Sequence, residues 1–326
     1  MYKYLGFFIM GLALASCREQ PTSNPPQVEQ SVTLDSVSSG TSSTLWAVSF
    51  PSAGTGYCVG NSGVLLRSYN AGSSWSLSTI ESCPLTAVFF WSDTEGLVGG
   101  YGGGLSFILH TRNGLASWDS VMTFAVPHAF GGTPNGWLLT GTYGEAGLVY
   151  ASTDTGRSWD PVAGTFKSVP VSAFAVQGGH WVATSPQVGP PIWGLTGGVG
   201  YSTGPDSSWQ VLHDGGNWQG VSMDASGNAV AVGDSGQTLW STDYGQSWTS
   251  VSSGGNYFLT GVAISSSGNI VAVGDSAILT GNVGSQSWTK LATPVYPLNA
   301  VTFLSSTKAV AVGMNGKIYT ITFSSP

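Results

Sequence analysis

The sequence predicts an all-β fold of seven four-stranded antiparallel sheets, and three observations support this prediction. An eight-residue phrase ending in tryptophan recurs along the chain, and its closing tryptophans lie 39 to 50 residues apart. Between them, apolar runs alternate with Gly- and Ser-rich turns, which is the pattern of short antiparallel strands. Units of about 40 residues with four strands are typical of β-propeller blades and not of solenoid coils, which use fewer strands per turn.

The composition excludes several other classes. The 326 residues include only 9 Lys and Arg against 16 Asp and Glu, a net charge of -7, so no basic surface is available to bind nucleic acid. Hydrophobic residues make up 41% of the chain, which is enough to form a core and excludes global disorder. The 47 glycines favour turns over helices.

The first element in chain order is a secretory signal over residues 1–17, with one lysine, an apolar stretch and small residues before Cys17. Leu14, Ala15, Ser16 and Cys17 resemble the lipobox of bacterial lipoproteins, which implies cleavage before Cys17 and lipidation of its sulfur. The apolar stretch is shorter than the roughly 20 residues that span a bilayer.

Residues 18–31 are rich in proline and poor in apolar side chains, so they predict a flexible tether. Position 18 is Arg and not the Asp that retains many enteric lipoproteins at the inner membrane. We therefore expect a lipid-anchored protein of the bacterial envelope, at the outer membrane or the cell surface, with residues 32–326 forming one propeller.

The seven blades follow in order. Their first strands are expected to begin near Leu45, Leu85, His128, Val171, Trp218, Leu259 and Leu298. The seventh unit stops after three strands, whereas residues 32–37 align with the fourth strand of other units. We expect residues 32–37 to complete the last blade, because pairing the two chain ends removes an exposed sheet edge.

The tryptophan phrase is complete in two units, STDTGRSW and STDYGQSW, and resembles the Asp-box of bacterial sialidases and other BNR-repeat propellers. The Asp is expected to accept hydrogen bonds from the turn's own amides, the Gly to adopt positive φ and the Trp to pack between sheets. These duties are structural. The residues assigned to them are Ser152, Asp154, Gly156, Trp159, Ser241, Asp243, Gly245 and Trp248.

The whole repeat, with a Val-Gly pair before the turn that joins second to third strands, is similar to the photosystem II stability/assembly factor family of propellers. The resemblance extends over residues 32–326 and implies a seven-bladed propeller. In photosynthetic organisms, members of that family are expected to bind a membrane-protein partner through a basic patch. No such patch is present in this sequence, so the resemblance does not carry a photosynthetic function over.

An enzymatic function has little support in the sequence. Sialidases bind the substrate carboxylate with three arginines, but Arg67, Arg112 and Arg157 all lie beside or inside Asp-box phrases, away from the tunnel. A two-carboxylate glycosidase has no visible acid pair. The four histidines have no metal-ligand spacing, so no cofactor or metal is expected.

Binding is expected on the face that carries the turns between second and third strands, because these turns are longer in blades two, three and four. The candidates are Tyr101, Tyr143, Glu145 and Trp193, with His128, His213, Asp214 and Trp218 from nearby links. The aromatic residues would either anchor a ligand or pack their own loops. Asp234 and Asp275, at matching turns, would either bind near the tunnel or cap those turns.

The sequence leaves two questions open. Cys58 and Cys83 form either a disulfide, as is possible in an exported protein, or two free thiols. The expected function is non-catalytic binding of an envelope protein, or assistance in assembling an envelope complex, by a monomer. The alternative is a carbohydrate-binding or glycoside-hydrolase propeller that uses the long-loop face.

Overall fold

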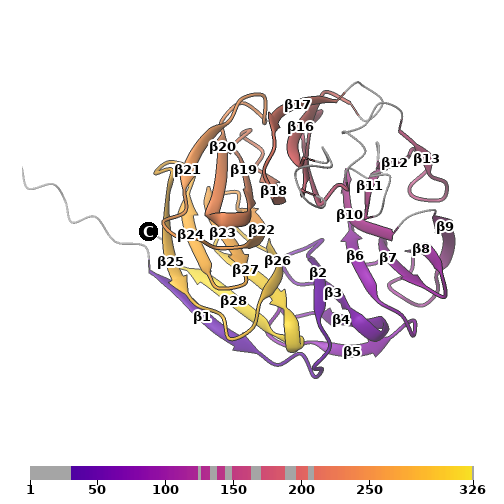
Figure 1. Ribbon diagram of the computed structural model, residues 1–326. Coiled ribbons are helices and arrows are strands. Elements are labelled where there is room, and N and C mark those ends of the chain that lie inside the picture. The colour runs from indigo at the N-terminus through magenta and orange to yellow at the C-terminus, as the bar shows by residue number, and fades with distance from the viewer. Residues whose placement is uncertain are drawn as a thin grey trace, which may run out of the picture.

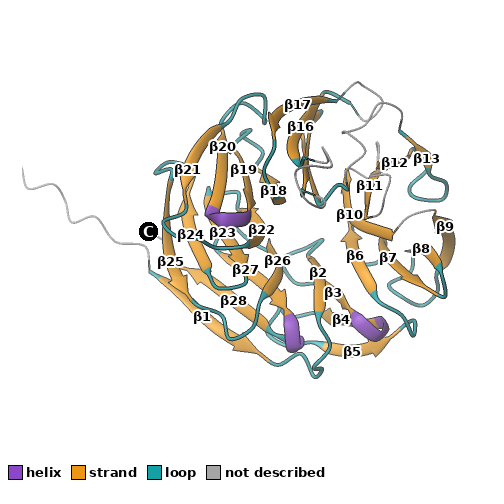
Figure 2. Cartoon of the chain, in the orientation of Figure 1, coloured by secondary structure: helices purple, strands orange, loops and turns teal. Residues whose placement is uncertain are grey.

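The computed structural model describes residues 31–123, 126–132, 138–143, 149–162, 170–187, 196–204 and 209–324. Seven four-stranded antiparallel sheets stand in a ring around a central axis (Figure 1). Within the described ranges there is almost no helix (Figure 2). In blades one, five and seven, a single 3-10 turn joins the second strand to the third. These turns are η1 (Asn61–Gly63), η4 (Asp234–Gly236) and η5 (Met314–Gly316). The predicted seven-bladed propeller is confirmed.

The strands of each blade follow one another from the axis outward. Blade one contains β2 (Leu45–Ser49), β3 (Gly56–Gly60), β4 (Val64–Ser68) and β5 (Ser76–Thr79). Blade two contains β6 (Leu85–Phe90), β7 (Gly96–Gly102), β8 (Leu105–Thr111) and β9 (Asp119–Thr123). Blade three contains β10 (Val126–Gly132), β11 (Leu138–Tyr143), β12 (Val149–Ser152) and β13 (Asp160–Pro161). Blade four contains β14 (Ala173–Gln177), β15 (His180–Ser185), β16 (Gly198–Ser202) and β17 (Gln210–Asp214).

Blades five to seven repeat the order. Blade five contains β18 (Trp218–Met223), β19 (Ala229–Gly233), β20 (Gln237–Ser241) and β21 (Thr249–Ser252). Blade six contains β22 (Leu259–Ile264), β23 (Asn269–Gly274), β24 (Ile278–Asn282) and β25 (Ser287–Ala292). Blade seven contains β26 (Leu298–Phe303), β27 (Lys308–Gly313), β28 (Ile318–Phe323) and β1 (Val32–Val37). The first strands begin at or within two residues of the predicted positions.

The ring is closed by the strand nearest the N-terminus. β1 pairs antiparallel with β28 over its whole length, from Val32 opposite Phe323 to Val37 opposite Ile318. Beyond the strands, the Ser324 N–H donates to the Ser31 carbonyl at 2.8 Å. The first and last described residues therefore lie side by side at the outer edge of blade seven (Figure 1). The expectation that residues 32–37 complete the last blade is confirmed.

The core consists of apolar layers between neighbouring blades. β19 is buried along its whole length, and its side chains alternate between two layers because successive residues of a strand point to opposite faces. Val230 and Val232 pack against blade six, whereas Ala231 packs against blade four. The repeated Ala-Val-Ala-Val sequence thus has a physical basis, since a second strand contacts a neighbouring sheet on both faces.

The complete Asp-box turns are closed by their own side chains. Asp154 Oδ1 accepts the backbone N–H groups of Arg157 and Ser158, both at 2.9 Å. Ser152 Oγ accepts the N–H of Gly156 at 2.8 Å, and the Trp159 indole donates to the Gly156 carbonyl at 3.2 Å. The corresponding bonds recur in the blade-five turn, which is formed by Ser241, Asp243, Gly245, Ser247 and Trp248.

Each box also fastens its blade to the preceding one. Gly156 has a φ of +83°, and a Cβ there would lie 2.9 Å from the Leu97 side chain of blade two. Gly245, with the same φ, would meet Val182 of blade four at 2.4 Å. Glycine is therefore required both by the left-handed backbone and by the close packing of the neighbouring blade.

Both described cysteines are free thiols. Cys58 is buried on β3, where burial raises the pKa of its thiol. Cys83 is half-buried in the link between blades one and two. The structure thus favours the second of the two alternatives left open by the sequence.

Candidate binding site at the tunnel mouth

The innermost strands share a local irregularity at their beginning. A β-bulge skips one residue near the beginning of the first strand in six blades, for example between Leu45 and Ala47 in blade one and between Pro127 and Ala129 in blade three. A bulge leaves one residue out of the pairing and redirects its side chain. The extra residues all line the central cavity: Trp46, Thr86, His128, Gln219, Thr260 and Asn299.

Several of these bulge residues join one blade to the next. Thr86 Oγ1 donates to the Pro127 carbonyl at 2.5 Å, and Thr260 Oγ1 donates to the Leu298 carbonyl at 2.6 Å. In blade four, Ser172 precedes β14 and donates to the Trp218 carbonyl at 2.8 Å. These bonds fix neighbouring first strands at the tunnel wall, so the wall is a rigid framework.

The bulge residues surround a cavity of about 750 Å³. Two glycines allow the wall to close: a Cβ on Gly220 would lie 3.1 Å from the Cα of Gly261, and a Cβ on Gly261 would lie 3.3 Å from the Cα of Ala300. Besides further first-strand residues, the lining includes residues at the ends of second strands and in links between blades: Tyr101, Phe258, Asp275, Pro297 and Met314. The cavity therefore opens on the predicted face, called here the mouth face.

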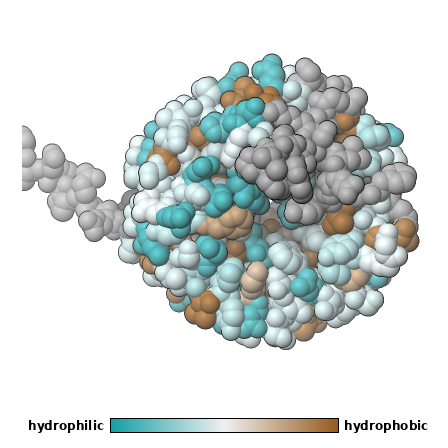
Figure 3. Space-filling model, viewed as in Figure 1, coloured by the Kyte–Doolittle hydropathy of each residue, from teal (hydrophilic) through white to brown (hydrophobic). Residues whose placement is uncertain are grey.

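The mouth face carries an unusual share of exposed apolar side chains. Tyr101 and Leu105 lie at the β7–β8 hairpin, Val295 and Tyr296 in the link before blade seven, and Met314 in η5. Their exposed fractions run from 39% to 75%. Figure 3 shows the molecule viewed along the axis, with a hollow near the centre of the ring. Exposed apolar residues gathered around a cavity are typical of a binding surface.

The structure brings some predicted residues to this mouth and not others. Tyr101 and His128 line the cavity, and burial lowers the pKa of His128. Asp214 is exposed, and its Oδ1 accepts a hydrogen bond from Thr196 at 3.1 Å. Glu145, Trp193 and the side chain of Tyr143 lie outside the described part of the chain.

Trp218 and His213 have structural contacts. Trp218 is 2% exposed, and its indole donates to the Gly215 carbonyl at 2.9 Å. The His213 ring packs edge-on against it at 5.3 Å between centroids. Trp218 occupies the same position in its blade as Leu45 and Leu259 do in theirs, since each pairs with the last glycine of the second strand. Because the Trp218 ring is buried there, it offers no surface to a ligand.

Sequence reasoning missed Trp46, Phe258 and Met314, which line the cavity. For Trp46 there was a signal: in five blades the extra residue follows an initial leucine or tryptophan of the first strand, as in Leu45-Trp46-Ala47. That position is shared by the blades, but a bulge there is not evident from an apolar pattern alone.

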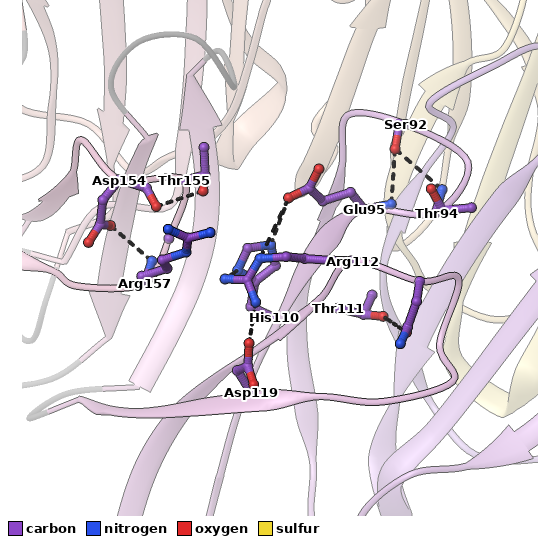
Figure 4. A network of polar contacts seen from close by, with 12 residues as sticks. Ser92, Thr94, Glu95, His110, Thr111, Arg112, Asp119, Asp154, Thr155 and Arg157 are labelled. Atoms are coloured by element: carbon purple, nitrogen blue, oxygen red, sulfur yellow. Dashed lines mark hydrogen bonds and ion pairs between the residues drawn. The ribbon is translucent and has the colours of Figure 1, made fainter.

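The described arginines, Arg67, Arg112 and Arg157, lie on the opposite side of the blades, in or next to the Asp-box turns, which form the box face. Arg67 Nη1 donates to the Gly114 carbonyl at 3.0 Å. Figure 4 shows Arg112 beside His110 and reaching Asp119. His110 is 1% exposed, and its Nε2 lies 3.3 Å from Glu95 Oε1. Burial, followed by the charge of Arg112, lowers the pKa of His110. Since Arg112 pairs with Glu95 and Asp119 within its own blade, we assign this cluster a structural role.

The described lining offers little for catalysis. Asp275 is the one carboxylate among the described residues that line the cavity. Within the described ranges, no group of three or more His, Cys, Asp or Glu residues is arranged to hold a metal ion. The described residues also include no helix that is long and apolar enough to cross a membrane.

The family model for photosynthesis system II assembly factor YCF48 matches residues 27–189. The chain belongs to this family. A solved structure of YCF48 bound to a D1 peptide superimposes with a TM-score of 0.70 at 17% identity, covering 88% of this chain and 94% of that one. YCF48 from Cyanidioschyzon merolae gives a TM-score of 0.67 at 16% identity, covering 88% and 98%. No curated protein sequence matches the chain significantly. At these identities the two structures support the fold alone.

Proposed function

We propose that this member of the YCF48 family is a non-catalytic propeller that binds a protein partner at the mouth face and assists assembly of an envelope complex. The observation that carries the proposal is the cavity of about 750 Å³, which opens on a face that carries the exposed apolar side chains of Tyr101, Leu105 and Met314. Rigid walls with a concave, mostly apolar centre suit recognition of a peptide segment, because little order has to be created on binding.

The relatives support a protein ligand over a small substrate. YCF48 has been solved with a D1 peptide bound, so the same fold accepts a peptide elsewhere in the family. The described cavity contains one carboxylate, Asp275, whereas acid–base hydrolysis of a glycoside uses two. Binding without chemistry therefore agrees better with the residues present.

The envelope location rests on the N-terminal sequence. Residues 1–17 end in the lipobox-like Leu-Ala-Ser-Cys, and a proline-rich segment separates Cys17 from β1. A lipid on Cys17 would hold the propeller at a membrane surface, with the tether entering at the outer edge of blade seven. The outer membrane or the cell surface is the favoured site, because Arg follows Cys17.

Affinity capture from the native membranes tests the proposal. The wild-type protein is compared with a mouth variant, Tyr101→Ala with Met314→Ala, and with a control variant, Tyr69→Ala with Leu77→Ala. The control pair is similarly exposed, at 63% and 47%, but lies at the Asp-box turn and outermost strand of blade one.

We expect one protein to be retained by the wild type and the control and lost from the mouth variant. Equal recovery by all three would contradict the proposed face. Recovery of glycans in place of protein would favour the carbohydrate-binding alternative, for which the exposed tyrosines offer stacking surfaces.

A further inference from the structure

The charge on the described cavity lining is negative. Its described residues include no lysine or arginine, and its one carboxylate is that of Asp275, at the turn after β23. Asp275 Oδ1 accepts the Phe258 N–H at 3.2 Å and the Ser276 hydroxyl at 2.8 Å. The other carboxylate oxygen has no hydrogen-bond partner in the described part of the chain, and the side chain is exposed at the mouth.

The mouth face carries further charged side chains that lie outside the cavity. Asp214 and Asp234 lie on the mouth face in blades four and five. Two ammonium groups reach towards the same face without lining the cavity: Lys290 lies over the Tyr257 ring at 5.2 Å, and Lys317 over the Tyr296 ring at 5.8 Å. The described arginines lie on the box face. Among the described residues that line the cavity itself, Asp275 is therefore the one carboxylate, and no lysine or arginine faces it.

This arrangement discriminates between ligands by charge. A carboxylate brought into a mostly apolar cavity beside Asp275 would lose its hydration and gain only repulsion. An ammonium or guanidinium group would form a charge-assisted hydrogen bond with the open carboxylate oxygen. It would also lie near the aromatic ring of Phe258, which lines the cavity beside Asp275 and whose face attracts cations.

We propose that the segment bound at the mouth is an apolar peptide that carries a lysine or arginine, and that Asp275 pairs with this basic group. This inference rests on the proposed function. The apolar side chains of the peptide would fill the cavity and contact the exposed rim at Tyr101 and Met314. The basic residue would lie at the blade-six side of the mouth, where Asp275 is held by Phe258 and Ser276.

A random dodecapeptide library displayed on phage tests this inference. It is panned against the wild-type protein and against Asp275→Asn, which keeps an oxygen able to accept the Phe258 N–H. The matched control is Asp234→Asn. Asp234 follows the second strand of blade five, just as Asp275 follows the second strand of blade six, but Asp234 does not line the cavity. Peptides that depend on the mouth are identified by their loss from the Tyr101→Ala/Met314→Ala variant.

We expect mouth-dependent peptides from the wild type and from Asp234→Asn to be apolar with a Lys or Arg, and those from Asp275→Asn to lose that preference. For one selected peptide, replacing its basic residue by Gln should weaken binding about five- to tenfold to the wild type and leave binding to Asp275→Asn unchanged. Mouth-dependent peptides that are neutral or acidic would overturn the inference alone. Absence of any mouth-dependent peptide would overturn the proposed function as well.

Discussion

Asn299 of the last blade donates a hydrogen bond through Nδ2 to the backbone carbonyl of Leu45 in the first blade, at 2.8 Å. The two residues are 254 positions apart in the chain, and their contact closes the ring at the tunnel wall. Together with the pairing of β1 and β28 at the outer edge, it closes the propeller at both its inner and its outer radius.

Asn299→Ala should therefore destabilise the whole ring. The substitution leaves the Leu45 carbonyl without its side-chain donor, and we expect a loss of about 1 kcal/mol in the free energy of unfolding. Urea denaturation measures it, and an unchanged free energy of unfolding would show that the inner closure is unimportant.

Removal of β1 should expose a sheet edge. A chain that starts after Val37 leaves the outer edge of β28 unpaired, so we expect aggregation, since unpaired strand edges recruit other chains. A chain that starts at Ser31 retains β1 and should remain soluble. Size-exclusion chromatography separates the two results, and a monodisperse product from the shorter chain would contradict a closure that depends on β1.

The Asp154 carboxylate should contribute a pH-dependent part of stability. Burial raises its pKa, but hydrogen bonds from Ser158, Ser152 and Arg157 outweigh burial and lower the pKa from 3.8 to about 2. Because the folded-state pKa is the lower one, the stabilisation is fully present above pH about 4 and is lost as the pH falls towards 2.

Asp154→Ala should accordingly cost on the order of 1 kcal/mol at neutral pH, with a difference from wild type that shrinks between pH 4 and pH 2. Chemical denaturation across this range measures the difference. A cost that is independent of pH would mean that the side chain's packing, and not its ionised hydrogen bonds, stabilises the turn.

Cys17→Ser should release the protein from the membrane. The prediction follows from the lipobox-like sequence, because serine has no thiol to accept the lipid. Metabolic labelling with radioactive palmitate and partition into Triton X-114 detergent provide the readouts. Cys83→Ser, which leaves the signal unchanged, should be labelled like the wild type. Labelling of the Cys17→Ser protein would show that the lipid is attached elsewhere or that the anchor is of another kind.

The repeat pattern was sufficient to predict the blades and their closure, because each blade is a local meander whose strands are marked by turns. It was less informative about the site, which is assembled from one residue per blade. Thr86 and Asn299 are 213 positions apart and share the tunnel wall only because a bulge turns each of them towards the axis. Trp218 illustrates the converse case: as an aromatic residue in a link it suggested a ligand contact, whereas its register with Leu45 and Leu259 places it in the core.

Site-specific photo-crosslinking in cells tests the central claim most directly. A benzophenone amino acid is placed at position 101 on the mouth face or at position 69 on blade one, both of which are exposed tyrosines, and the cells are irradiated. We expect position 101 to give a covalent adduct with one envelope protein, and position 69 to give none with that protein. Adducts from position 69 alone, or the same adduct from both positions, would contradict a partner-binding site at the tunnel mouth.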